Sequence, residues 1–454
     1  MLRKSLAIVL ILAFALSACQ AFDLFGAPKN TGGNSGNPSN NSGGNSGSNN
    51  SGNSGNNNNG NSGNTLNNPP PVKPTATKTL EPTATVAPTP TYTPTPVPQT
   101  FGPDNYPEGM NPLTCETVQD PASLNIPPAL ISISNFPASA RPQAGLAWAN
   151  WVMEGYIGEG MNRFLGVFHG DFPSSNNGGS MELPDSATSI GPIRSGRVWY
   201  EDWRQLFDGS LVAASGAPQV LAQLGSFNYY FGSDEGDINS ALIPIDKLKD
   251  IAESNTHRLG ANSLDGNICD INAPADGVAA NSFFTFYAPL NQALWKYEPS
   301  LGAYQRYQND TVTGDNFTLM TDRIDSIPLT FENLIIVYAN FHGPKDAYFY
   351  IDLLYNDGPA QIMRDGQLYD IRWSTQAGEY EKTTGKNRPM RFTYDNGDPF
   401  PLKPGQTWVL LAPLTSQHTM HETVAEGNYI QRLTQNVPGS GHWAIRIYGP
   451  TIEK

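Results

Sequence analysis

The chain has 454 residues, with 27 Lys and Arg against 41 Asp and Glu, so its formal net charge is −14 at pH 7. This acidic balance repels phosphate backbones and excludes nucleic acid as an expected partner. Anionic membrane surfaces repel such a chain as well, so a membrane contact requires an anchor. Length alone allows two domains, but the segment before residue 101 has too few apolar side chains to join a core.

Residues 1–18 are predicted to form a signal peptide. Two basic residues precede an apolar run that is too short to span a bilayer and fits a secretory h-region. The run ends in LSAC, where Cys19 occupies the position of the lipid-bearing cysteine in the bacterial lipobox. We therefore expect cleavage before Cys19 and acylation, for example with palmitate, which anchors the protein on the extracytoplasmic face of the cell membrane. The alternative is an ordinary signal peptide with a chance cysteine.

Residues 19–100 predict a disordered linker behind this anchor. Residues 30–68 are almost entirely Asn, Gly and Ser, so few apolar side chains offset the entropy of ordering. Residues 69–99 are rich in Pro and Thr, which favours an extended polyproline II spacer. The two parts together span on the order of 100 Å. We expect them to hold a domain away from the membrane, either as a bare spacer or with O-glycans on the threonines.

Strand and helix patterns alternate over residues 101–280. The predicted strands are 129–136, 161–170 and 209–216. Apolar residues at helical spacing predict helices over 144–156, 199–207, 217–224 and 245–254. We therefore expect a mixed α/β fold, a layered sandwich of sheets and helices whose N-terminal half is α/β.

Residues 281–416 predict a strand-rich half. Successive runs rich in aromatic and β-branched residues are separated by turn signals, such as Asp-Gly at 365–366 and Asn-Gly at 396–397. Residues 417–454 form a C-terminal extension with one more predicted strand over 442–450. The chain has no internal repeat.

Two cysteines remain once Cys19 carries a lipid. An exported domain permits a disulfide between Cys115 and Cys269. The alternative is that both thiols are buried and unpaired.

Several segments resemble the YerB-like lipoprotein family of bacteria. The N-terminal region contains ISISNFPASARPQAGL, NRFLGVF and IGPIRSGR in the family's order, and the C-terminal region contains ENLIIVYANF and PLKPGQTWVLLAP. The resemblance covers residues 128–415 and implies that 101–280 and 281–416 are the family's N- and C-terminal regions. It implies a layered mixture of sheets and helices in an extracytoplasmic lipoprotein. It implies no particular reaction.

The chain departs from the family's pattern at positions with chemical potential. Glu154 matches a family acid, but the second acid stands one position later, as Glu159, and Asn162 replaces a threonine before Arg163. A histidine that the family carries in the strand over 209–216 is absent here. These departures weaken a catalytic role for these positions.

The motif IGPIRSGR, residues 190–197, predicts an anion site. A loop that leads into a helix exposes backbone N–H groups, and two guanidinium groups beside them suit a carboxylate or a phosphate. A third arginine lies on the preceding strand, and an acid nearby is a candidate partner or base. The candidate ligand-binding residues are Arg163, Arg194, Ser195, Arg197, Glu154 and Glu159.

The alternative for these arginines is a structural network. Buried charges must be paired, and such networks are common in plain scaffolds. The acids available for pairing are Glu154, Glu159, Glu201 and Asp202.

Other chemistries have weaker support. Ser195 and Ser215 lack the G-x-S-x-G context of a serine nucleophile. The motif HTMHE places His418, His421 and Glu422 close together, but its order is neither HExxH nor the inverse. The acidic segments at 232–237 and 394–398 lack EF-hand spacing. We therefore expect no metal and no cofactor.

These features together favour a non-enzymatic binding module of the cell envelope. Its expected partners are an envelope glycan or a protein, and exposed aromatic rings in the strand-rich half suit sugars. The alternative is a cell-wall or glycan-acting hydrolase that uses Glu154 and Glu159 as acid and base. A third possibility is simple structural spacing at the cell surface.

Overall fold

The structure of this chain is a computed structural model. The residues that it describes are 100–172, 189–232, 237–255, 262–310, 312–343, 349–416, 429–430 and 433–447. The chain divides into two units, Met1–Thr95 and Pro96–Lys454, and every described residue belongs to the second. No helix among these residues is long and apolar enough to cross a membrane.

Some predictions concern residues outside the described ranges. They include the signal peptide over 1–18, the lipid on Cys19 and nearly all of the linker. The HTMHE residues His418, His421 and Glu422 also lie outside, as does most of the acidic segment at 232–237.

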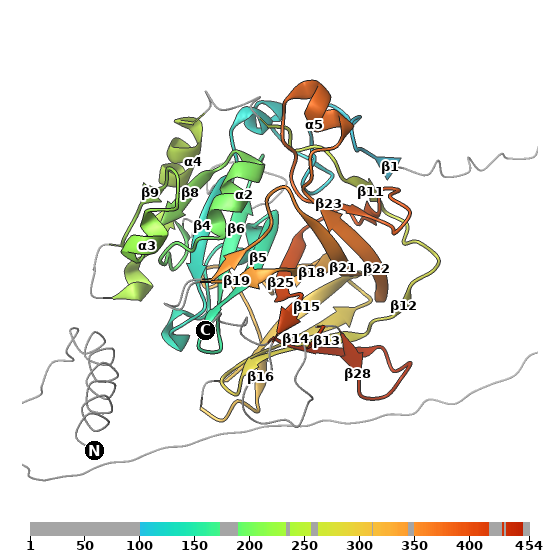
Figure 1. The fold of residues 1–454 in the computed structure, drawn as a ribbon. Helices are drawn as coiled ribbons and strands as arrows, with labels where there is room; N and C mark the ends of the chain where they lie inside the picture. The colour runs from blue at the N-terminus through green and yellow to red at the C-terminus, as the bar shows by residue number, and fades with distance from the viewer. Residues whose placement is uncertain are drawn as a thin grey trace, which may run out of the picture. The chain divides into compact units, whose positions relative to one another are not determined.

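A large mixed sheet forms the centre of the second unit (Figure 1). Its strands, in spatial order, are β12 (Val278–Ala279), β22 (Gln367–Ser374), β21 (Asp357–Arg364), β18 (Asn333–Ala339), β25 (Thr407–Pro413), β5 (Trp151–Gly158), β6 (Met161–Phe168), β4 (Ala129–Ser134), β8 (Ser210–Ala213) and β9 (Asn228–Tyr229). A further strand, β23 (Arg391–Thr393), pairs with β22.

The two halves of the chain meet in the middle of this sheet. Strand β25 runs parallel to β5, from Thr407 opposite Trp151 to Leu411 opposite Gly155, and it also runs parallel to β18. All residues of β18 and β25, and residues 151–156 of β5, are buried. Strands buried on both faces carry continuous apolar runs rather than alternating ones. The centre of the sheet is therefore the centre of the core.

A second sheet packs against the large one through aromatic side chains. Its strands, in spatial order, are β16 (Phe317–Leu319), β15 (Ala303–Asn309), β14 (Asn291–Glu298), β13 (Ser282–Ala288), β29 (His442–Arg446) and β28 (Thr434–Gln435), with β17 (Thr330–Phe331) paired to β15. The indole ring of Trp408 on β25 lies 5.1 Å from each of three rings, namely those of Phe164, Trp295 and Phe331. Trp408 therefore joins the two sheets.

Short helices cover one side of the large sheet. Figure 1 shows α2 (Tyr200–Phe207), α3 (Pro218–Leu221) and α4 (Ile245–Glu253) gathered beside β4, β6 and β8, with α5 (Glu379–Thr384) near β23. Single turns of 3-10 helix occur at Pro121–Asn125, Ala138–Ala140, Leu146–Trp148 and Ile238–Ser240.

Small sheets connect the loops. They are β1 (Thr100–Phe101) with β11 (Ile268–Asp270) and β24 (Pro401–Leu402), β2 (Met110–Asn111) with β3 (Glu116–Thr117), β7 (Ser189–Ile190) with β10 (Ile243–Pro244), β19 (Phe341–His342) with β20 (Tyr350–Ile351), and β26 (Thr415–Ser416) with β27 (Tyr429–Ile430).

The expectation of a layered sheet and helix sandwich with an α/β N-terminal half was wrong. Strands dominate both halves, and the helices are few and short. Residues 144–156, predicted as a helix, form a 3-10 turn at Leu146–Trp148 and then β5. Trp151 to Tyr156 are buried on both faces of the sheet, and such a run gives the same apolar pattern as a buried helix. The strand-rich expectation for residues 281–416 agrees with the structure.

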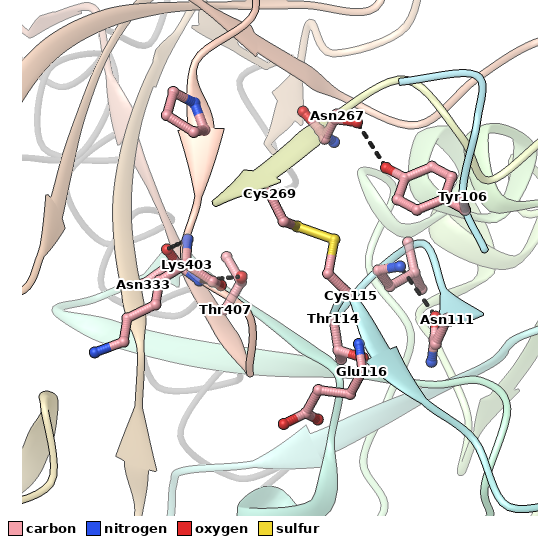
Figure 2. Close-up of a disulfide and its surroundings, with 12 residues drawn as sticks. Tyr106, Asn111, Thr114, Cys115, Glu116, Asn267, Cys269, Asn333, Lys403 and Thr407 are labelled. Atoms are coloured by element: carbon pink, nitrogen blue, oxygen red, sulfur yellow. Dashed lines mark hydrogen bonds between the residues drawn. A yellow bond between two sulfur atoms is a disulfide. The ribbon is translucent and has the colours of Figure 1, made fainter. Parts of the chain in front are cut away.

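Cys115 and Cys269 form a disulfide (Figure 2). Cys115 lies in the tight turn between β2 and β3, while Cys269 lies on β11, which pairs with β24 in parallel. Both side chains are buried. The bond therefore ties the segment that precedes the large sheet to strands that come much later in the chain.

Candidate functional site

The three candidate arginines converge on one face of the large sheet. Arg163 lies on β6, and its Nη1 donates a hydrogen bond to the carbonyl oxygen of Ser195 at 3.0 Å. The backbone N–H of Arg194 donates to the carbonyl oxygen of Ser132 on β4 at 2.9 Å, which fixes the loop against the sheet. Arg197 follows in the same loop, just before α2. We call Arg163, Arg194 and Arg197 the arginine cluster.

A glycine on β5 allows this loop to lie close to the sheet. Gly155 is directly opposite Arg163 in the register of β5 and β6. A Cβ at Gly155 would lie 2.7 Å from Cζ2 of Trp199, the N-cap residue of α2. The indole ring therefore packs directly on the strand backbone and sets the position of the loop that carries Arg194 and Arg197.

The electrostatics of the cluster favour a bound anion. Arg163 is 4 % exposed. Its burial and the neighbouring charges of Arg197 and Arg194 lower its pKa well below the usual range of an arginine. Burial and Arg197 lower the pKa of Arg194 as well. Within the described part of the chain no carboxylate pairs with Arg163 or Arg194, and Nε of Arg163 has no hydrogen-bond partner. A buried cation without a counter-charge is costly, and an anion would relieve that cost.

The two acids on α2 are engaged elsewhere. Glu201 forms an ion pair with Arg204 at 2.5 Å. Asp202 accepts hydrogen bonds from the backbone N–H groups of Leu353 and Leu354, both at 3.2 Å. Burial raises the pKa of Asp202 to about 6. Neither acid has a hydrogen bond with the arginine cluster among the described residues.

Glu154 lies on the opposite face of the sheet from the arginine cluster. Successive side chains on a strand point to opposite faces, and the neighbouring Gly155 faces the cluster. Glu154 forms a buried ion pair with Arg306 of β15 at 3.3 Å, with the two side chains 2 % and 0 % exposed. It also accepts hydrogen bonds from the indole Nε1 of Trp408 at 2.8 Å and from the Asn162 amide.

Aromatic rings enclose the partner of Glu154. The guanidinium carbon of Arg306 lies 5.3, 5.5 and 4.9 Å from the ring centroids of Phe164, Trp295 and Trp408. The ion pair therefore lies between the two sheets and connects them. Sequence reasoning missed Arg306. The sequence did contain a signal for it. In the alternating pattern of the strand at 303–309, Arg306 falls on the same face as Tyr304.

A chain of buried amides extends from this ion pair. The Asn135 amide donates to the side-chain oxygen of Asn162 at 2.7 Å. Nε of Arg141 and the amide of Gln143 donate to the side-chain oxygen of Asn135 at 3.0 and 3.2 Å. Burial, and after it the charge of Arg306, lower the pKa of Arg141 to about 10. Arg141 and Gln143 belong to the ARPQAGL motif, whose polar residues the site prediction did not include.

The remaining candidates are not part of a catalytic arrangement among the described residues. Glu159 is exposed in the turn between β5 and β6. The hydroxyl of Ser195 forms a hydrogen bond with that of Ser215 at 2.9 Å. The structure thus brings Arg163, Arg194, Ser195 and Arg197 together, and it places both candidate glutamates apart from them. No group of three or more His, Cys, Asp or Glu within the described ranges is arranged to hold a metal.

The fold and the site define a class of strand-rich domain in which two chain regions share one sheet, with an arginine cluster on one face and a buried ion pair on the other. Residues 113–241 match the family described as protein of unknown function (DUF3048), N-terminal domain, and residues 284–409 match its C-terminal domain. The chain belongs to this family.

One relative is the YerB protein of Bacillus subtilis (strain 168), which carries the name of a lipoprotein. It is 24 % identical over 306 residues, which cover 63 % of this chain and 81 % of the relative. The crystal structure of Bacillus subtilis YerB matches with a TM-score of 0.50 and 22 % identity, over 67 % of this chain and 96 % of that chain. This likeness shows a shared fold, and it supports the correction of the expected α/β half.

Proposed function

We propose that this protein is a lipid-anchored binding module of the cell envelope, and that its arginine cluster binds the carboxylate or phosphate of an envelope component. The observation that carries the proposal is the buried Arg163, which has two like charges beside it and no paired carboxylate among the described residues. Arg194 is half-buried, so an anion would be held by one buried and one accessible guanidinium group.

The proposed anchor rests on two supports. The first is the LSAC sequence, which ends the apolar run at Cys19. The second is the similarity to YerB, which carries the name of a lipoprotein. Metabolic labelling with a fatty acid tests the anchor, because Cys19→Ala should abolish the label and release the protein from the membrane fraction. A labelled Cys19→Ala variant would contradict it.

Titration of the purified protein with inorganic phosphate and with acetate tests the anion site. We expect saturable binding by calorimetry and a rise in the unfolding temperature. Arg194→Gln should weaken binding by about tenfold to a hundredfold, because a hydrogen bond to a charged group contributes about 1.5–3 kcal/mol. Arg372→Gln is the matched control, since Arg372 is a half-buried arginine paired with Asp357 on another part of the sheet. Equal losses in both variants, or no binding at all, would refute the site.

We do not propose the hydrolase, because Arg306, Trp408 and Asn162 already engage the carboxylate of Glu154. Incubation with purified cell wall distinguishes the two functions. We expect the protein to sediment with the wall without releasing soluble fragments. Released fragments would show that binding alone does not describe its function.

A further inference from the structure

A cavity of about 250 Å³ lies where residues of the two sheets meet, away from the arginine cluster. Three aromatic residues line it: Tyr369 of β22, Tyr394 just after β23, and Trp443 of β29. Three polar residues line it as well: Asp276 before β12, Gln361 of β21 and Asp370 of β22. We call this cavity the aromatic pocket.

The aromatic pocket lies at a gap in the sheet edge. Strand β22 pairs with β12 through Gln367 and Leu368, and with β23 through residues 372–374. Between these pairings, residues 369–371 have no strand partner on that edge within the described part of the chain. Two of the lining residues, Tyr369 and Asp370, belong to this open stretch.

Hydrogen bonds hold two of the aromatic rings in place. The hydroxyl of Tyr369 donates to the carbonyl oxygen of Pro274 at 2.8 Å, and the indole Nε1 of Trp443 donates to that of Ala279 at 2.9 Å. Both acceptors belong to the segment around β12. Gly277 lets this segment approach closely, since a Cβ there would lie 2.6 Å from Cζ of Tyr369. Rings fixed before binding lose little conformational entropy when a ligand arrives.

The polar side of the aromatic pocket is anionic. Asp276 and Asp370 are both exposed, and neither forms an ion pair within the described ranges. Asp370 accepts a hydrogen bond from the Gln361 amide at 2.7 Å, and Gln361 in turn accepts one from the Tyr338 hydroxyl at 2.7 Å. The carboxylate of Asp370 is therefore held in one orientation.

Aromatic rings beside two carboxylates that form no ion pair with a described residue favour a cation that also has an apolar surface. Alkylated ammonium groups combine these properties, and they bind to aromatic faces by cation–π attraction. A neutral sugar would stack on the rings and donate its hydroxyls to the carboxylates, but it carries no positive charge to offset theirs. The cavity is smaller than the roughly 300–1,000 Å³ of sites for drug-sized ligands, which suits a compact group. We propose that the aromatic pocket binds a small alkylammonium compound of the size of choline.

Calorimetric titration of the mature protein with choline tests the proposal. We expect saturable binding that weakens as salt is added, because the carboxylates contribute through charge. The neutral isostere 3,3-dimethyl-1-butanol should bind at least roughly tenfold more weakly, since it has the same shape without the charge. Equal binding of the isostere, or tighter binding of N-acetylglucosamine than of choline, would overturn the proposal.

Variants separate direct contact from general electrostatics. Asp370→Asn should weaken choline binding by roughly tenfold. Asp395→Asn is the matched control, because it removes the same charge from a residue next to Tyr394 that does not line the pocket. It should change the affinity for choline by less than about twofold. Tyr394→Leu should weaken binding, and Tyr394→Phe, which keeps the ring, should not. Equal effects of Asp370→Asn and Asp395→Asn would refute the site. Arg194→Gln should leave choline binding unchanged, so this site and the proposed anion site fail or hold independently.

Discussion

Glu154 and Glu159 lie on the same hairpin of β5 and β6 but in opposite surroundings. Glu154 is 2 % exposed and shares its carboxylate among Arg306, Trp408 and Asn162. Glu159 is exposed in the turn. At the scale of single residues, burial rather than residue type decides what a carboxylate does here.

Replacing each glutamate by glutamine tests this difference. Glu154→Gln should lower the free energy of unfolding by about 3–5 kcal/mol, because it leaves the Arg306 guanidinium buried without a counter-charge. Glu159→Gln should change it by less than about 0.5 kcal/mol, as is usual for surface positions. Urea denaturation of the two variants measures the effect. Equal stability of both would contradict the role of Glu154 as a partner of Arg306.

His169 predicts a pH dependence of stability. Its side chain is 3 % exposed, and burial lowers its pKa to about 4, although Nδ1 lies 3.1 Å from the carbonyl oxygen of Ile126. In the unfolded chain a histidine titrates near pH 6.5. Between pH 6.5 and 4 the histidine is protonated in the unfolded state but not in the folded state. The free energy of unfolding therefore falls as the pH drops from about 6.5 to 4, by about 3 kcal/mol in total.

His169→Gln should remove this loss. Asp202 and Asp322 have pKa values raised to about 6, so their contribution has the opposite sign and stabilises the fold as the pH falls through that value. Denaturation of wild type and variant at several pH values between 7 and 4 measures the effect. The contributions of Asp202 and Asp322 are the same in both proteins, so they cancel in the difference. A difference between the two proteins that stays constant with pH would show that His169 does not titrate in this window.

At the scale of elements, the contact between β5 and α2 positions the arginine cluster. Gly155→Ala should destabilise the protein by about 1–3 kcal/mol, because its Cβ meets the indole of Trp199. Trp199→Leu in the same chain should relieve part of this cost, so the double variant should be more stable than the sum of the single changes predicts. Chemical denaturation of all four proteins completes the cycle, and strict additivity would refute the contact.

Local sequence patterns predicted some strands and loops, but they could not predict which distant residues these elements contact. The strands expected over 129–136 and 161–170 are β4 and β6, and the loop at 190–197 does carry two arginines beside Arg163. The face of Glu154 was not predictable, because it depends on the strand register that places Gly155 opposite Arg163. Arg306 was missed because its partner lies far away in the chain, and no local periodicity reports such a pairing.

At the scale of the whole molecule, the disulfide is a long-range restraint. Cys115 and Cys269 are separated by 154 positions, and closing so long a loop restricts the unfolded chain strongly. The double variant Cys115→Ser and Cys269→Ser should lose about 2–5 kcal/mol of stability. Denaturation with and without reductant measures this, and thiol counting under denaturing conditions should find no free Cys115 or Cys269 in the wild type. An unchanged midpoint in reductant would contradict the restraint.

The parallel pairing of β5 with β25 has a consequence for biosynthesis. Residues 151–155 find their partners only at 407–411, so a nascent chain emerges with β5 long before β25 leaves the ribosome. Until then the hydrogen-bonding groups along that side of β5 have no native strand to pair with, and such bare edges recruit other chains. A polypeptide truncated before residue 407 would keep this unpaired strand edge permanently. Chaperones and proteases would therefore recognise it as an incompletely folded protein.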